Sequence, residues 1–165
     1  MNKIDKKDKN IYRLTRENLN LTRQKVADMI SELDPSEYEI FDEYRLNKIE
    51  RESIQQIHPG EIVTLAKIYD KPELRNYYCC NHCAIGKIDA PEVANTGCIH
   101  EILIEMAVTL KRLNHNKIRL MEILEDEKVS EDEATDFNRI YEDLERISAT
   151  VEAIQLWCEK KKVIC

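Results

Sequence analysis

The sequence contains little glycine and proline, the residues that mark tight turns. Its 165 residues include three Gly and four Pro, too few for the many turns of an all-β protein. No run approaches the roughly 18–20 consecutive apolar residues that a membrane span needs. Residues 1–7 are charged and lack the apolar segment of a secretory signal. We therefore expect a cytoplasmic protein without a membrane partner.

Motifs of the common enzyme classes are also lacking. The sequence contains no glycine-rich phosphate-binding loop, no metalloprotease motif and no evident serine or cysteine nucleophile elbow. It therefore predicts a protein without catalytic residues, and we expect that it is not an enzyme.

Charge is abundant but unevenly distributed. Hydrophobic residues make up 42% and charged residues 35% of the chain, a composition typical of folded globular proteins. Of the net charge of −7, residues 1–75 contribute −1 and residues 76–165 contribute −6. The first half is nearly neutral, so local basic patches there are compatible with an acidic chain.

Short helical patterns fill the first half of the chain. Thr22 is the expected N-cap of a helix over residues 23–30, because its hydroxyl can accept a backbone N–H of the first turn. Breaks at Asp34-Pro35 and Pro59-Gly60 separate this helix from the next two. We expect helices over about 11–21, 23–30, from Ser36 or Glu37 to about 49, and 61–69, with a last short helix from residue 71.

Three segments of this region, LTRQKVA at 21–27, RLNKIER at 45–51 and residues 59–69, lie in a characteristic order. They resemble the second helix, the end of the recognition helix and the fourth helix of the Xre family, the lambda-repressor-like helix-turn-helix regulators. The resemblance covers about residues 11–75. It implies an all-α helix-turn-helix domain over residues 1–76 that binds double-stranded DNA and regulates transcription.

The resemblance also implies which residues contact DNA. In such domains the second helix crosses the phosphate backbone and the third enters the major groove. Arg23 and Lys25 are then expected at phosphates, and Tyr44, Arg45 and Lys48 on the groove side of the third helix. An arginine there can pair with guanine through two hydrogen bonds, which contributes about 1–3 kcal/mol of discrimination.

The chain departs from the family pattern in ways that favour an alternative function. The interval from Ala27 to Glu50 is about nine residues longer than usual, and Glu52 stands where the family commonly has Gly. Glu50 resembles the family's structural acid, which we expect to cap or pair internally. Four acids surround the start of the third helix and would repel phosphate: Glu37, Glu39, Asp42 and Glu43. The alternative is a protein-interaction adaptor that has the helix-turn-helix fold, does not bind DNA, and binds a partner protein through its C-terminal helical hairpin.

A cysteine-containing segment over residues 77–96 is expected to form a hinge. Clustered cysteines in a reducing compartment indicate metal or redox chemistry before structural disulfides. Cys79 and Cys83, four positions apart, combine with Cys98 and His100 into a possible zinc site of four Cys and His ligands. A redox-sensitive thiol pair and reduced, partly buried cysteines are the alternatives, and no other cofactor is indicated.

Residues 97–165 show two long helical patterns with a seven-residue repeat. The acids after Ser130 form a capping box that predicts the start of the second helix near that residue. We therefore expect an antiparallel coiled-coil hairpin that joins two chains into a homodimer. The expected seam consists of Ile99, Met106, Leu113 and Leu120 with Leu103, Leu110, Lys117 and Leu124 in the first helix, and of Phe137, Leu144, Val151 and Cys158 with Ile140, Ile147 and Ile154 in the second.

Overall fold

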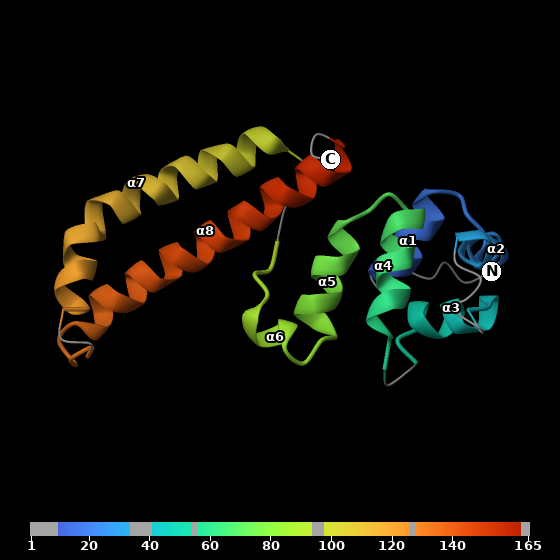
Figure 1. Ribbon diagram of the computed structural model, residues 1–165, viewed down its shortest axis with the longest axis horizontal. Helices are drawn as coiled ribbons and strands as arrows, with labels where there is room; N and C mark the ends of the chain where they lie inside the picture. Colours follow the sequence, from blue (N-terminus) through green and yellow to red (C-terminus); the bar gives the residue numbers. More distant parts are fainter. Residues whose placement is uncertain (1–9, 34–40, 54–55, 94–97, 126–127, 163–165) are drawn as a thin grey trace, which may run out of the picture. The chain divides into compact units, whose positions relative to one another are not determined.

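A computed structural model describes residues 10–33, 41–53, 56–93, 98–125 and 128–162 of the chain (Figure 1). Every regular element in these ranges is a helix, which confirms the predicted all-α class. None of the helices described is long and apolar enough to cross a bilayer. The chain divides into two compact units, Met1–Ala90 and Pro91–Cys165.

Polar residues before the helices of the first unit determine where these helices begin. The Thr22 hydroxyl accepts from the Lys25 N–H at 3.1 Å, as predicted, and Asp42 accepts from the Arg45 N–H at 2.7 Å. Asp42 has an extended backbone, and the helix begins at Glu43. The predicted start of the third helix at residue 36 or 37 is therefore wrong for residues 41 and 42, the part of that stretch that the structure describes. The helices are α1 (Ile11–Asn18), α2 (Arg23–Leu33), α3 (Glu43–Glu50), α4 (Pro59–Ile68), α5 (Glu73–Asn81) and α6 (Gly86–Asp89).

One apolar core joins helices α1 to α5. Residues three or four apart on each helix face inward, as the helical period requires. The aromatic rings of Tyr77 and Tyr78 pack against this core from α5. The buried members are Tyr12, Val26, Ile30, Phe41, Leu46, Ile49, Ile57, Ile62, Leu65, Ala66, Tyr69 and Leu74.

The segment predicted as a hinge is folded up to Ala90. Helix α5 continues through Cys79, and the Tyr78 hydroxyl donates to the Ile57 carbonyl at 3.0 Å. Helix α6 packs on α5 at Gly86, where an added Cβ would lie 2.4 Å from the Cys79 carbonyl oxygen. The first unit therefore extends beyond the predicted boundary at residue 76, because aromatic packing and this close backbone contact hold α5 and α6 on it.

The second unit consists of α7 (Ile99–Ile123) and α8 (Ala134–Lys160), which run side by side in opposite directions (Figure 1). The Glu133 carboxylate accepts from the Ser130 N–H at 3.1 Å, one of the two contacts of a capping box. The Ser130 hydroxyl donates to the same carboxylate, and the residue before the helix, Glu133, has no side-chain capping bond, so the predicted cap at Ser130 is wrong. The helix itself begins four residues later than predicted, at Ala134. We call these two helices the helix pair.

The seam of the helix pair differs from the predicted one in one of the two positions on each helix. Ile102 and Thr109 are buried on α7, whereas Leu103 and Leu110 are 48% and 46% exposed. This prediction took the apolar residue four positions after Ile99, but the structure buries the residue three positions after it. On α8, likewise, Asp143 and Thr150 are buried while Leu144 and Val151 are exposed, and Lys117 and Leu124 on α7 are exposed as well.

Ion pairs across the helix pair give the physical reason for this rotation. Arg112 lies 3.2 Å from the buried Asp143 carboxylate, and Arg119 lies 3.0 Å from Asp136. Spacings of three and of four residues between the two seam positions both fit a seven-residue repeat, so the repeat alone does not determine which residues are buried. These ion pairs form between the helices when each helix is rotated so that its leucines face outward.

We predict that Gly86→Ala lowers the free energy of unfolding by about 1–3 kcal/mol, because the new methyl group would collide with rigid backbone of α5. Urea-induced unfolding measures this loss. The exposed neighbour provides a control, since Lys87→Ala should change the free energy by less than about 0.5 kcal/mol. Equal stability of the two variants would contradict the close contact.

The C-terminal end of α3 generates a second prediction. Glu52 has a φ of 53°, in the left-handed region that favours glycine. Glu52→Gly should therefore raise the free energy of unfolding by about 1 kcal/mol. Asp70 at the end of α4 has a φ of 51°, but aspartate tolerates this conformation better, so Asp70→Gly should gain less in the same urea titration. A loss of stability in Glu52→Gly would refute this account.

Candidate functional site

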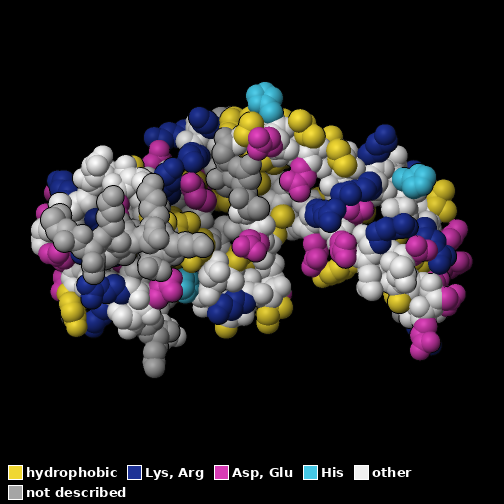
Figure 2. Space-filling model, turned by 180° about the vertical axis from the view of Figure 1, so that it is seen from behind, with side chains coloured by type: hydrophobic (Ala, Val, Ile, Leu, Met, Phe, Trp, Pro, Cys, Tyr) yellow, Lys and Arg dark blue, Asp and Glu magenta, His cyan; other side chains and the backbone are white. Residues whose placement is uncertain are grey.

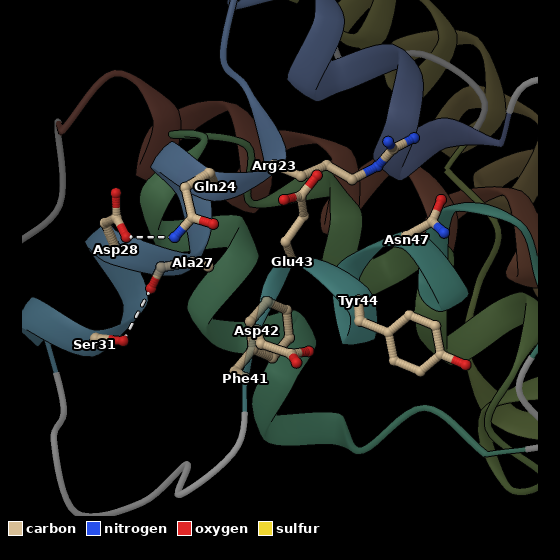
Figure 3. A pocket seen from close by; sticks show the side chains of 10 residues that line it. All are labelled: Arg23, Gln24, Ala27, Asp28, Ser31, Phe41, Asp42, Glu43, Tyr44 and Asn47. Carbon is tan, nitrogen blue, oxygen red and sulfur yellow. Dashed lines mark hydrogen bonds between the residues drawn. The ribbon is translucent and has the colours of Figure 1, made fainter.

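An open groove lies between α2 and α3 (Figure 3). Its volume is about 580 Å³. We call it the α2–α3 groove. It is lined by Arg23, Gln24, Ala27, Asp28, Ser31, Phe41, Asp42, Glu43, Tyr44 and Asn47.

A buried ion cluster holds α1, α2 and α3 together beside this groove. The Glu50 side chain is 0% exposed and accepts from Arg16 Nε at 2.5 Å and Arg23 Nε at 2.7 Å. Arg16 also donates to the Leu21 carbonyl at 2.7 Å. The hydrogen bond with Glu50 raises the pKa of Arg16. The expected internal pairing of Glu50 is therefore confirmed, and it fixes the position of α2 against α3.

Two of the five predicted DNA contacts belong to internal ion pairs. The Arg23 guanidinium extends away from Gln24 and Asp28 (Figure 3), and its Nε is bound to Glu50. Arg45 donates to both carboxylate oxygens of Glu61, at 2.6 and 2.9 Å. This pairing raises the pKa of Arg45. The guanidinium that we expected at a guanine edge is paired with α4 instead.

The other three predicted contacts lie at the surface. Tyr44 is 63% exposed, and the Lys48 ammonium lies 4.3 Å from the centre of its ring, within the range of a cation–π contact. Lys25 is exposed on α2. These three side chains occupy neighbouring helices that the Glu50 cluster holds in a fixed arrangement.

Two amide residues of the groove, Gln24 and Asn47, were missed by the sequence reasoning. Gln24 donates to Asp28 at 2.9 Å. Asn47 Oδ1 is buried and has no hydrogen-bond partner among the residues that the structure describes. Its spacing of three from Tyr44 on one helix could have indicated that both belong to the same face.

The acidic side chains that line the groove have different local roles. Asp42 caps α3, and Asp28 accepts from Gln24, so both have local partners. Glu43 stands in the first turn of α3, where a negative charge stabilises the helix. Glu37 and Glu39 lie outside the described residues. The charged side chains that line the groove are thus Asp28, Asp42, Glu43 and Arg23.

The residues of the predicted zinc site belong to different units. Cys79 and Cys83 lie in the first unit, and Cys98 and His100 lie in the second. Cys83 Sγ accepts from the Gly86 N–H at 3.4 Å, which connects it to the start of α6. Within the described ranges, no three His, Cys, Asp or Glu side chains gather in a way that could hold a metal ion. The zinc site stays a prediction from the sequence.

We predict that Glu50→Gln lowers the free energy of unfolding by about 3–5 kcal/mol, because it leaves Arg16 and Arg23 without their buried counter-charge. Urea-induced unfolding at neutral pH measures the loss. Glu32→Gln, at an exposed position of α2, should change the free energy by less than about 0.5 kcal/mol. If both variants were equally stable, the cluster would not hold the helices together.

No protein-family model, curated protein or solved structure matches this chain. A functional assignment therefore depends on the α2–α3 groove, the side chains around it, and the resemblance of residues 21–27, 45–51 and 59–69 to the Xre family.

Proposed function

We propose that the protein is a dimeric, sequence-specific DNA-binding regulator of transcription. In this proposal the first unit is a lambda-repressor-like helix-turn-helix domain, and the second unit is a helical hairpin that joins two chains. Helix α3 enters the major groove and α2 crosses the phosphate backbone. The observation that carries the proposal is the position of Lys25, Tyr44 and Lys48 on two helices that the Glu50 cluster holds together. Lys25 and Tyr44 are exposed, and Lys48 is half-buried with its ammonium 4.3 Å from the centre of the Tyr44 ring.

The side chains of this surface have different roles in the proposal. Lys25 and Lys48 neutralise phosphates, which supplies affinity without reading the sequence. Gln24, which is exposed on α2, offers a side-chain amide, the group that pairs with adenine in the major groove. Arg23 and Arg45 are positioning residues, because their guanidinium groups hold Glu50 and Glu61.

Dimerisation sets the geometry of the DNA site. Two helix-turn-helix domains related by a two-fold axis read half-sites about 34 Å apart, one turn of DNA. The helix pair supplies the contact between chains. We therefore expect an operator with two-fold symmetry.

A second candidate function is a protein-interaction adaptor that has the same fold and does not bind DNA. The charges of the α2–α3 groove favour it, since Asp28, Asp42 and Glu43 line the groove and Arg23 is bound to Glu50. In this case a basic segment of a partner protein would enter the groove. The two candidate functions differ in DNA binding: the regulator binds a specific DNA sequence, and the adaptor binds none.

Selection from a random DNA pool with the purified full chain at moderate salt separates the two functions. A regulator enriches a sequence that contains two related half-sites. An adaptor enriches none, and that outcome would reject the proposal.

For the enriched DNA, we predict that the double variant Lys25→Ala/Lys48→Ala lowers the slope of log affinity against log salt by about 2, one for each lost phosphate contact. Fluorescence anisotropy at several salt concentrations measures this slope. Lys67→Ala, which removes an exposed charge of α4 that does not line the groove, should leave it unchanged. A double variant with the slope of the wild type would show that DNA does not contact this surface.

A further inference from the structure

The helix pair has two different flanks beside its seam. Arg112 on α7 and Arg139 and Arg146 on α8 line one groove along the pair. Arg112 follows the seam residue Met106 by six positions and Arg146 follows the seam residue Ile140 by six, so this flank is the same heptad position on both helices. Figure 2 shows this charged flank, where dark blue and magenta side chains gather between α7 and α8.

The opposite flank is apolar on both helices. On α7 this flank holds the residues four positions after Ile99 and its heptad repeats, and on α8 those four positions after Ile140 and its repeats; in an antiparallel pair these positions of the two helices are neighbours. Lys117, the single charged residue among these eight positions, which begin at 103 and at 137, can extend its ammonium to solvent along its apolar stem. We call this surface the apolar flank; its exposed large side chains are Leu103, Leu110, Leu124, Leu144 and Val151 at these positions, and Tyr141, whose ring stacks on Phe137.

The contact between the two helices is partly polar. Its buried apolar side chains are few, and Thr109, Asp143 and Thr150 are buried as well. A two-helix unit of this size needs further burial of apolar surface to be stable. Leucines of both helices, in contrast, lie on the exposed flank. The buried apolar residues of the pair are Ile102, Ile123, Ile140, Ala153 and Leu156.

We propose that the apolar flank is covered by the same flank of a second copy of this chain, in a four-helix bundle. The core of such a bundle takes apolar residues from the seam positions and from one flank of each helix. The repeat of seven extends over both helices, so the flank is complementary to itself under a two-fold axis. The proposal deepens the dimeric part of the proposed function and does not depend on DNA binding.

The area of the flank is sufficient for such a dimer. Its exposed large side chains present on the order of 500 Å² of surface, within the range of the largest patches found on monomers. Two copies would then bury about 1,000 Å² in total, which reaches the lower limit of a specific interface.

Sedimentation equilibrium of the full chain, without DNA and at micromolar concentration, tests the proposal. The wild type should have twice the 19.4 kDa mass of one chain. Leu110→Lys and Leu144→Lys should each weaken the dimer by about tenfold or more, because each buries a charge in the interface. Circular dichroism should show unchanged helix content, since both side chains are 44–46% exposed in the single chain.

The other flank of α7 offers a matched control. Val108 is 51% exposed and lines the charged groove, so Val108→Lys should leave the dimer intact. A monomeric wild type would overturn the proposal, and a partner protein or a segment of the same chain would then cover the flank. Equal effects of the three substitutions would also overturn it. A dimer that binds no DNA would reject only the regulator function.

Discussion

The arrangement of α1, α2 and α3 depends on a single buried carboxylate. Glu50 has no exposed surface and binds the guanidinium groups of Arg16 and Arg23. Removing a carboxylate from water is costly, and two cations at hydrogen-bond distance offset that cost only in one geometry. The three helices that contribute these side chains are therefore held at defined positions. The exposed surface of α2 and α3 is therefore rigid, and a binding surface must be rigid if it is to discriminate between ligands.

The same ion pairs change how the surface charges of the first unit should be interpreted. Arg23 and Arg45 count as basic residues in the sequence, yet in the fold their guanidinium groups are bound to the Glu50 and Glu61 carboxylates. Lys25 remains as an exposed charge and Lys48 as a half-buried one, near a groove that also carries carboxylates. The balance between DNA binding and protein binding thus rests on a few exposed side chains, and not on the net charge of the domain.

The helix pair shows how a heptad repeat leaves one choice open. Leu103 and Ile102 both fit the same repeat on α7, as do Leu144 and Asp143 on α8. The structure buries Ile102 and Asp143, with Arg112 paired to the aspartate. The leucines then form a separate apolar surface. A partly polar seam and an apolar flank on the same two helices are consistent with a unit that completes its core by association.

The sequence by itself determined the all-helical class, the breaks between helices, the Thr22 cap, and the structural role of Glu50. Each of these follows from local periodicity or from contacts that short motifs encode. Only the tertiary structure decided that Arg45 pairs with Glu61, that α5 and α6 belong to the first unit, and that the leucine stripe is exposed. These features depend on residues distant in sequence and on helix rotation, neither of which a periodic pattern specifies.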